Sequence, residues 1–381
     1  MQNMDNDRLQ KKIRGYHIFS AFYNFRRKFP GKRKGIFFVM THDKSMNGNC
    51  GVMLETLKGA GYKTYALTRK HTSFGWNLFG AVRFFVVKSF QMAKCDTIFL
   101  DNTFLPTAFC EIPPSVRVAM LWHGTGTIKK FGLDTTVGPL RDLEEAADKK
   151  ITHLFVASDY TKSIYSHCFG LPEDRIYVTG NPRCDELFRA HESGEDLREK
   201  DKFTVLFATT FREGIPGEAP YYELRALLRK LWTKNRKIQV LLRLHPHVSY
   251  ELKGRSEFIM FGNCTDVSRV ENLNNIMKKA DLLVTDYSSV CYDFAILERP
   301  ILFYAPDLDY YRTEERGFYE DYESFVPGPV IKRMDRLAEE ILNIASDPAK
   351  PDVSKQEAFM DMAFAFKDSN ATERIMEVLE L

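Results

Sequence analysis

The sequence predicts an α/β protein with two doubly wound, Rossmann-like domains, and three observations support this fold class. Short apolar runs rich in Val, Ile, Leu and Phe recur from residue 35 onward and alternate with helical or loop stretches. Runs this short, and apolar on both faces, are typical of buried parallel strands. A polar, charged stretch at 191–202 divides the runs into two series, as a linker between domains does. The length of 381 residues is enough for two domains.

The expected strands follow one another along each series. The first series comprises the runs at 35–40, 62–67, 97–101, 116–121, 153–157 and 176–179. The second series comprises the runs at 203–208, 238–244, 258–261, 282–285 and 301–304. We therefore expect a basic aromatic N-terminal segment, an N-terminal α/β domain, a linker, a C-terminal α/β domain and a C-terminal helix, at 1–34, 35–190, 191–202, 203–355 and 356–381.

Composition excludes several classes of protein. The chain is 44% hydrophobic and 28% charged, which excludes global disorder, collagen and a coiled coil. Its seven cysteines are odd in number and include no Cys-x-x-Cys pair, which argues against a disulfide framework and structural zinc. Arg83 and Lys88 interrupt the apolar stretch at 76–92, so we expect no spanning helix. Residues 1–10 carry charges where a signal peptide needs an apolar run, so we expect a cytoplasmic protein.

Positive charge is concentrated at the N-terminus. Residues 1–34 hold ten Lys and Arg against two Asp, whereas the whole chain has a net charge of only +3. A nucleic-acid-binding protein would spread its basic surface more widely, so we expect no nucleic-acid partner. Basic residues interleaved with Phe suit an anionic membrane surface, but a solvated arm or a helix packed on its own domain would fit as well. On a helical wheel, one apolar face is formed by Ile18, Phe22, Phe25 and Phe29.

Polar and reactive residues follow five of the expected strands. These segments come directly after, or at the end of, apolar runs, at 122–127, 180–183, 208–212, 243–247 and 285–289. Because ligands of open α/β sheets bind beyond the carboxyl ends of the strands, we expect these segments to form a binding site. With two such domains, the two edges would face each other across a cleft.

Two of these segments carry groups suited to acid–base and phosphate chemistry. His123 can act as a general base, because the pKa of imidazole is close to neutral pH, or it can simply cap the next element. Arg243 can bind phosphate bidentately, and His245 can donate a proton to a leaving oxygen. An ion-paired arginine and a turn before Pro246 would explain the same two residues.

The segment at 285–289 leads into an expected helix. Ser288 and Ser289 offer hydroxyl groups and main-chain N–H groups to an anion such as a diphosphate. Ordinary N-capping by Asp286 or Ser288 is the alternative. The sequence has no Walker A loop, dinucleotide-binding glycine motif, zincin motif or nucleophile elbow, and no Asp-x-Asp motif at the strand ends. We therefore expect a phosphate diester or diphosphate ligand, with no metal site and no cofactor.

Four motifs and one long block occur in a fixed order along residues 94–322. The motifs are Trp-His-Gly-Thr at 122–125 with Lys-Lys-Phe-Gly at 129–132, Gly-Asn-Pro-Arg at 180–183, Arg-x-His-Pro at 243–246 and Thr-Asp-Tyr-Ser-Ser-Val at 285–290, and the block covers 299–322. Together they resemble the CDP-glycerol glycerophosphotransferases that build teichoic acids and related capsule polymers. The resemblance implies a GT-B architecture of two facing domains, as the alternation of strands also suggests.

The resemblance implies transfer of glycerol phosphate from CDP-glycerol to an acceptor hydroxyl, with release of CMP. The acceptor would be a glycan or polymer carried on a polyprenyl diphosphate. The enzyme would act as a peripheral protein on the cytoplasmic face of the cell membrane. Its N-terminal domain would bind the acceptor, and its C-terminal domain would bind CDP-glycerol. The compact length favours a primase over a polymerase, and the oligomeric state is left open.

The resemblance also implies roles for individual residues. His123 would be the catalytic base near the acceptor hydroxyl, and His245 would act at the diphosphate. The residues that would bind CDP-glycerol are Gly124, Thr125, Gly126, Thr127, Arg183, Thr209, Thr210, Arg243, Leu244, His245, Ser288, Ser289 and Asp293.

One departure from the family pattern concerns the donor. Members often have Pro after His-Gly-Thr, whereas this chain has Gly126, followed by Thr127 and Ile128 before Lys129. CDP-ribitol is an alternative donor, because only a few contacts recognise the polyol part of the donor. A nucleotide-sugar glycosyltransferase of GT-B architecture and a non-catalytic membrane scaffold are two further alternatives.

The aromatic stretch at 74–90 has a separate interpretation. Its aromatic residues, beside Arg83, Lys88 and Lys94, could hold the lipid end of an acceptor or dip into the membrane interface. A core helix of the first domain would fit the same residues.

Overall fold

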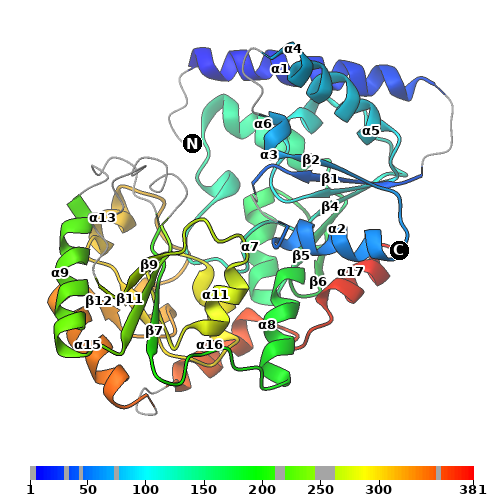
Figure 1. The fold of residues 1–381 in the computed structure, drawn as a ribbon. Coiled ribbons are helices and arrows are strands. Elements are labelled where there is room, and N and C mark those ends of the chain that lie inside the picture. The colour runs from blue at the N-terminus through cyan, green and yellow to red at the C-terminus, as the bar shows by residue number, and fades with distance from the viewer. Residues whose placement is uncertain are drawn as a thin grey trace. The chain divides into compact units, whose positions relative to one another are not determined.

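The structure is a computed structural model that describes residues 6–29, 34–42, 46–72, 77–210, 219–244, 262–348 and 353–381. The chain divides into two compact units (Figure 1). The first unit contains Met1–Gly124, Lys130–Asp185 and Phe364–Leu381, and the second contains Thr125–Lys129 and Glu186–Ala363. The chain thus enters the second unit at Thr125 and returns to the first at Lys130. It passes into the second unit again at Glu186 and returns to the first at Phe364, where its last residues lie.

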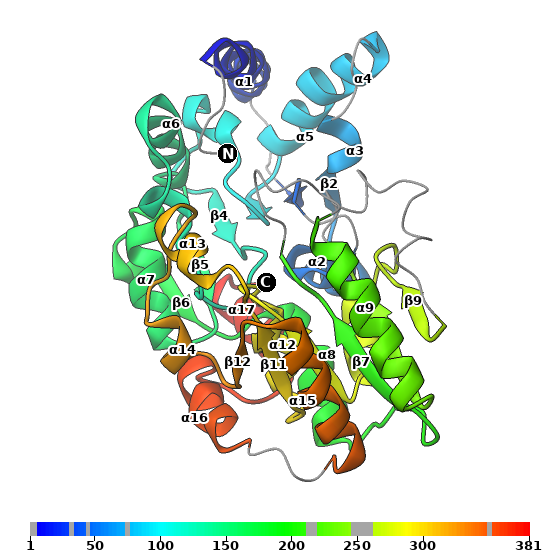
Figure 2. The same cartoon turned by 90° about the vertical axis from the view of Figure 1, so that its left-hand side faces the viewer.

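The first unit is built on a six-stranded sheet with the strand order β2-β1-β3-β4-β5-β6. Its strands, all parallel, are β1 (Ile36–Met40), β2 (Thr64–Thr68), β3 (Thr97–Leu100), β4 (Arg117–Met120), β5 (His153–Val156) and β6 (Ile176–Val178). On one face, Met53 and Leu57 of α2 (Asn49–Gly59) and Ile375 of α17 (Ala371–Val378) join a core with Phe38 and Phe99. On the other side of the strands lie α1 (Asn6–Arg27) and α5 (Ser89–Ala93) (Figures 1 and 2).

Shorter helices connect the strands of the first unit. They are α3 (Arg69–Thr72), α4 (Leu78–Val82), the π-helix η1 (Arg83–Lys88), η2 (Leu105–Phe109), η3 (Gly132–Asp134), α6 (Gly138–Asp148), α7 (Asp159–Phe169), η4 (Glu173–Arg175) and α8 (Pro182–Glu192), the last of which continues into the second unit.

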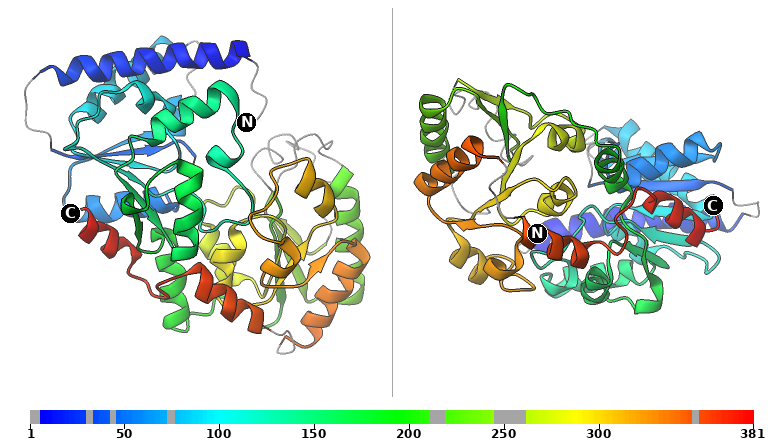
Figure 3. Two further views of the ribbon diagram at one scale, coloured as in Figure 1. Left: turned by 180° about the vertical axis from the view of Figure 1, so that it is seen from behind. Right: turned by 90° about the horizontal axis from the view of Figure 1, so that it is seen from below.

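The second unit repeats this architecture with the strand order β12-β11-β10-β7-β8-β9. Its parallel strands are β7 (Phe203–Phe207), β8 (Ile238–Leu242), β9 (Cys264–Asp266), β10 (Leu282–Thr285), β11 (Ile301–Tyr304) and β12 (Val330–Ile331). Side by side, α9 (Ala219–Lys234) and α15 (Met334–Ser346) pack leucines and isoleucines against the sheet (Figure 3). The remaining helices are α11 (Leu273–Lys279), α12 (Val290–Ala295), α13 (Leu308–Thr313), α14 (Tyr322–Phe325) and α16 (Ser354–Ala363).

The predicted fold class is confirmed, because both units contain parallel sheets flanked by helices. Ten of the expected strands are present with small shifts at their ends, and the expected strand at 258–261 lies outside the described residues. Two further strands, β9 and β12, were not expected. Both are short edge strands whose side chains are partly or fully exposed, so neither produces an apolar run.

The N-terminal segment forms a helix that packs on its own unit. In α1, Phe19 and Tyr23 are buried, and the side chain of Asn24 exchanges hydrogen bonds with the main chain of Phe109 and Glu111. The opposite face is not covered in the same way. Ile18, Phe25 and Phe29 are 46%, 52% and 53% exposed. The helix therefore has both a structural face and a solvent-facing apolar face.

From Leu78 to Ala93, α4, η1 and α5 follow one another without a break, so this part of the stretch forms one helical run that contains a π-helical turn. Phe84 and Met92 are buried, whereas Leu78 and Phe79 are exposed. Across the described residues, we find no helix with both the length and the apolar character needed to cross a bilayer.

The C-terminal part of the chain, expected as one helix, forms α16 in the second unit and α17 in the first. The buried carboxylate of Asp185 accepts hydrogen bonds from the main-chain N–H groups of Ala371 and Thr372, both at 3.0 Å. Because the first N–H groups of a helix lack partners within the helix, this carboxylate stabilises the start of α17.

We expect Asp185→Ala to lower the free energy of unfolding by about 1–2 kcal/mol, because it leaves two buried N–H groups without an acceptor. Denaturant unfolding would measure the change. Glu377→Ala, at an exposed position of the same helix, is the matched control and should change the free energy little. Equal effects of the two substitutions would contradict the capping role.

Candidate active site

His123 of the first unit follows β4 and is oriented by a hydrogen bond to the main chain. Its Nδ1 lies 3.2 Å from the main-chain oxygen of Asp101, which follows β3. A carbonyl oxygen can only accept, so Nδ1 of the neutral ring carries the proton and Nε2 carries the basic lone pair. This is the tautomer that a general base needs if Nε2 is to accept the proton.

Asp101 is a further residue of this site, and sequence reasoning missed it. Its buried carboxylate accepts hydrogen bonds from the main-chain N–H groups of Thr41, at 3.0 Å, and His42, at 2.9 Å. Asp101 thus joins the carboxyl ends of β1 and β3, and its own carbonyl holds His123 after β4. An acidic residue directly after a buried apolar run was the signal available in the sequence.

Two aromatic contacts complete the surroundings of His123. The ring of His42 stacks on that of His123, with centroids 3.5 Å apart and planes inclined by 12°. Trp122 has a φ of 54°, a left-handed conformation that is strained for a bulky residue. Its indole ring packs against Phe131 and Phe169, and this packing holds the strained turn that presents His123.

The loop that carries His123 is also held by Asn49 and Arg183. Asn49 Nδ2 donates to the main-chain oxygens of Leu121 and Trp122 at 3.0 and 3.1 Å, and its Oδ1 accepts from the main-chain N–H of Arg183. Arg183 Nη1 donates to the main-chain oxygen of His123 at 2.7 Å. Arg183 was predicted to bind the donor, and in this structure its guanidinium group also positions the histidine loop. Asn49 was not among the predicted residues.

The next residues of the motif, Thr125 to Thr127, pack into the second unit. Thr125 Oγ1 donates to the carboxylate of Asp293, and the main-chain N–H of Thr127 donates to the hydroxyl of Tyr292 at 3.2 Å. Thr125 and Thr127 are each only 1% exposed. The structure therefore brings together two motifs that are far apart in the sequence. Gly124 belongs to the first unit, where its carbonyl accepts from the hydroxyl of Tyr165 at 3.3 Å.

The glycine that departs from the family pattern has a steric explanation. A Cβ atom at Gly126 would lie 2.0 Å from the ring of Tyr292. Because no real Cβ atom approaches a ring so closely, the turn can pack on Tyr292 only with glycine at this position.

Another aspartate, Asp286, links the carboxyl ends of β7 and β10 by hydrogen bonds. The buried carboxylate of Asp286 accepts from the main-chain N–H of Thr210 at 2.8 Å and from its hydroxyl at 3.1 Å. Thr209 and Thr210 are half-buried beside it. Ser288 and Ser289 are half-buried before α12, and Ser288 Oγ accepts from the main-chain N–H of Val290 at 3.3 Å. The predicted residues of these two strand ends thus share one edge.

The end of β8 is described only in part. Arg243 Nη1 donates to the main-chain oxygens of Val267 and Val270 at 3.3 and 2.8 Å, and burial lowers the pKa of its guanidinium group. Leu244 is buried, and its main-chain N–H donates to Ser268 Oγ at 2.8 Å. His245, predicted to act at the diphosphate, lies outside the described residues. Among the residues that the structure describes, no cluster of three or more His, Cys, Asp or Glu could hold a metal ion.

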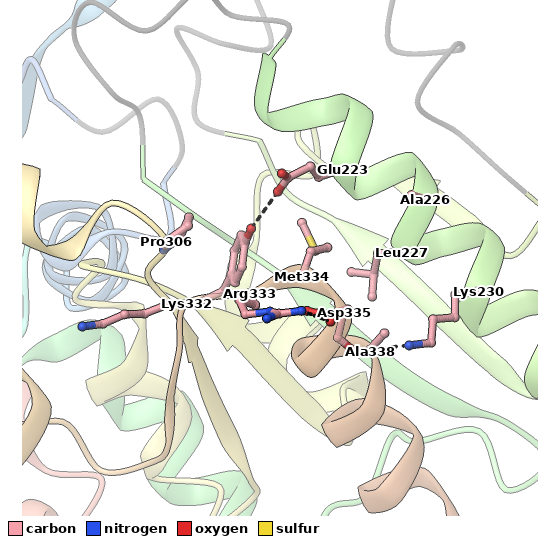
Figure 4. Close-up of a pocket in the computed structure, with 11 residues that line it drawn as sticks. Glu223, Ala226, Leu227, Lys230, Pro306, Lys332, Arg333, Met334, Asp335 and Ala338 are labelled. Carbon is pink, nitrogen blue, oxygen red and sulfur yellow. Dashed lines mark hydrogen bonds and ion pairs between the residues drawn. The ribbon is translucent and has the colours of Figure 1, made fainter.

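A hollow of about 440 Å³ opens beside the end of β11 in the second unit (Figure 4). Its walls come from α9, from the ends of β11 and β12 and from the start of α15, and they include Tyr304, whose hydroxyl donates to Glu223 at 3.0 Å. Arg333 at its rim is paired with Asp335 at 2.6 Å. None of the predicted site residues lines this hollow.

Comparison with known proteins identifies the family. The family model described as CDP-Glycerol:Poly(glycerophosphate) glycerophosphotransferase matches residues 21–381. The chain belongs to this family. The predicted family is thereby confirmed.

Among curated relatives, the teichoic acid ribitol-phosphate polymerases TarK and TarL of Staphylococcus aureus are 32% and 31% identical to the chain, over 76% and 95% of its length. The chain spans only 57% and 65% of these two proteins. The teichoic acid glycerol-phosphate primase of Bacillus subtilis is 28% identical over 76% of the chain and 75% of the primase.

Solved structures confirm the GT-B-like fold. The wall teichoic acid polymerase TagF, in a variant soaked with CDPG, superposes with a TM-score of 0.74 at 20% identity, over 99% of this chain and 98% of that chain. The UDP-GlcNAc 2-epimerase of Neisseria meningitidis has a TM-score of 0.53 at 13% identity, over 91% and 99% of the two chains. At these identities the likeness concerns the fold alone.

We expect Gly126→Ala to lower the free energy of unfolding by about 1–3 kcal/mol, because the added methyl group overlaps the Tyr292 ring. Urea unfolding would measure it. Gly59→Ala is the matched control, since no atom lies within 4 Å of a Cβ at that helical position. A Gly126→Ala protein as stable as the Gly59→Ala protein would show that the turn does not pack on Tyr292.

Proposed function

We propose that the chain transfers glycerol phosphate from CDP-glycerol to a hydroxyl of a glycan or polymer carried on a polyprenyl diphosphate, in the synthesis of teichoic acid or a related cell-surface polymer. The observation that carries this proposal is the orientation of His123. Its Nδ1 faces a main-chain carbonyl at 3.2 Å, so Nε2 is the basic atom of the neutral ring. Family membership supplies the type of reaction.

In the proposed reaction, Nε2 of His123 takes the proton of the acceptor hydroxyl as the oxygen attacks the phosphorus that bears glycerol. The new P–O bond forms in line with the bond to CMP, which breaks, so that CMP leaves with the bonding electron pair. Negative charge grows on the transferred phosphoryl group and on the leaving oxygen. We assign its stabilisation to Arg243, to the hydroxyls of Ser288 and Ser289, and to His245 as donor to the leaving group.

Two features of the chain support a shared role for the predicted base and the predicted donor-binding residues. His123 and Thr125 are separated by a single residue, and Thr125 is hydrogen-bonded to Asp293, which lies in α12, four residues after Ser289. Thr209 and Thr210 lie at the neighbouring strand end and are tied to Asp286 of the same motif. Arg183 supports the base through the main-chain oxygen of His123.

CDP-ribitol is the second candidate donor. Two relatives above 30% identity are named as ribitol-phosphate polymerases, whereas the Bacillus subtilis relative is named as a glycerol-phosphate primase. Both donors share the cytidine diphosphate and differ only in the length of the polyol. The groups at 209–210 and 288–289 would serve either donor.

We further propose that the protein works at the cytoplasmic face of the membrane. The exposed Ile18 and Phe25 of α1, and the exposed Phe29 just after it, accompany Arg26 and Arg27 of its last turn. Apolar side chains next to cations suit the boundary between headgroups and acyl chains of an anionic bilayer.

We expect His123→Ala to reduce CMP release from CDP-glycerol by about 10²–10⁴-fold, the usual contribution of a general base, while the dissociation constant for CDP-glycerol changes little. Product release by chromatography and donor binding by calorimetry would measure the two effects. His167→Ala, at an exposed position on α7, is the control and should leave both unchanged. Normal turnover by the His123→Ala protein would refute the assignment.

The donor can be identified by direct competition. The protein would be incubated with CDP-glycerol, CDP-ribitol and UDP-sugars together with a lipid-linked disaccharide, and the products would be weighed by mass spectrometry. We expect the mass of one or more glycerol phosphate units to be added. Addition of ribitol phosphate would establish the second candidate, and addition of a sugar would refute a phosphotransferase function.

A further inference from the structure

A π-helical turn lies beside the edge strand β2 of the first unit. The turn η1 spans Arg83–Lys88 between α4 and α5, and Ser89 Oγ donates to the main-chain oxygen of Val86 at 3.0 Å. Such turns are rare and are frequent at functional sites, because they redirect side chains that a regular helix would place elsewhere. Lys88 is the last residue of this turn.

Lys88 reaches the outer edge of the sheet and is only 7% exposed. Its Nζ donates to the main-chain oxygen of Ala66 at 2.6 Å and to Gln91 Oε1 at 3.3 Å. Both partners are neutral, so the positive charge of the ammonium group is not neutralised by them. An ammonium group has three donors, and these two bonds use two of them.

His71 lies in α3, three residues after the end of β2, and its ring offers a second hydrogen-bond donor. The main-chain N–H of Thr68 donates to His71 Nδ1 at 3.0 Å, so the proton of the neutral ring is on Nε2. Burial lowers the pKa of His71, and the nearby Lys88 and Arg83 lower it further. Burial also lowers the pKa of Lys88, with Arg83 as the second cause.

Acidic side chains do not balance the two cations of this region. Within the parts of the chain that the structure describes, no carboxylate forms an ion pair with His71, Arg83 or Lys88. Two cations, of which Lys88 is buried, together with the neutral Nε2–H of His71, favour an anion that can accept from all three groups. A diphosphate, with several acceptor oxygens and more than one negative charge, suits three such donors.

Exposed apolar side chains adjoin these donors in the same stretch of chain. Leu78 and Phe79 are 77% and 87% exposed, and Val82 and Val87 are 47% and 43% exposed. The start of α4 is not frayed, because Asn77 Oδ1 accepts from the main-chain N–H of Phe79 at 3.0 Å. A well-formed helix that presents Leu and Phe to solvent indicates an apolar partner.

We propose that this surface, formed by His71, Leu78, Phe79, Arg83 and Lys88, binds the isoprenoid diphosphate of the lipid-linked acceptor. The diphosphate would lie on the three donors and the first isoprene units on Leu78 and Phe79. A bilayer surface fits less well, because its headgroups meet solvated cations at a protein surface, whereas Lys88 is buried and His71 half-buried. The inference rests on the proposed function, which supplies such an acceptor.

The position of this surface in the sheet suits an acceptor whose hydroxyl reacts at His123. His71 follows β2 and His123 follows β4, and the order β2-β1-β3-β4 places these strands three steps apart. At about 4.8 Å per step, the two strand ends are about 14 Å apart along the same edge. A glycan between the diphosphate and the reacting hydroxyl would span that interval.

The test uses the double variant Phe79→Ser with Arg83→Ala, at two exposed positions where substitution should not affect folding. The matched control is Val137→Ser with Lys58→Ala, an exposed apolar residue and an exposed cation elsewhere in the same unit. In detergent without a bilayer, we expect the KM for the lipid-linked acceptor to rise about tenfold or more in the first variant only. The KM for CDP-glycerol and the kcat should stay unchanged in both.

A binding measurement separates this inference from the proposed function. Calorimetry with farnesyl diphosphate needs no turnover, and we expect binding to the wild-type protein that the double variant weakens about tenfold or more. If the protein turns over no donor but still shows this difference, the proposed function fails and the site stands. Equal binding of farnesyl diphosphate by the double variant and the control variant would overturn the inference. Equal binding of inorganic diphosphate and farnesyl diphosphate would also overturn it. So would a loss of binding to phosphatidylglycerol vesicles in the double variant with an unchanged acceptor KM.

Discussion

The hydrogen bond between His123 and the main-chain oxygen of Asp101 is the interaction on which the proposed chemistry depends. It sets the orientation of the ring and the tautomer together, because a carbonyl oxygen can only accept. The carbonyl is itself fixed, since the carboxylate of Asp101 binds the main chain after β1. The position of one imidazole therefore depends on three adjacent strands, β1, β3 and β4, and on a strained turn at Trp122 that aromatic packing holds in place.

Aspartates that are buried or half-buried perform a similar task in several parts of the protein. Asp101 joins the ends of β1 and β3, and Asp286 joins the ends of β10 and β7. Asp281 accepts from the main-chain N–H of Thr204 at the opposite end of the same pair of strands, and Asp185 caps α17. In each case a carboxylate takes up N–H groups that the regular ladder or helix leaves without a partner, which offsets much of the cost of burying the charge.

The motif at 122–127 is continuous in the sequence but divided between the two units. His123 and Gly124 belong to the first unit, whereas Thr125 to Thr127 are packed in the second, on Asp293 and Tyr292. Thr125 and Thr127 were predicted to line the donor; both are buried and form hydrogen bonds with residues of α12. Their direct contact with a donor stays a prediction, as do the roles of Thr209, Ser288 and His245.

The fold class, ten of the strands and the family could be predicted from the sequence alone. Buried parallel strands need continuous apolar runs, and catalytic motifs are local, so both can be read along the chain. The edge strands β9 and β12 lack such runs. The contacts of Asp101, Asn49 and His42 around the histidine loop, and the return of α17 to the first unit, are visible only in the folded structure. The physical reason is that their partners are main-chain atoms and rings from distant segments. The sequence around a polar residue that follows a strand does not predict which of these main-chain atoms or rings it will contact.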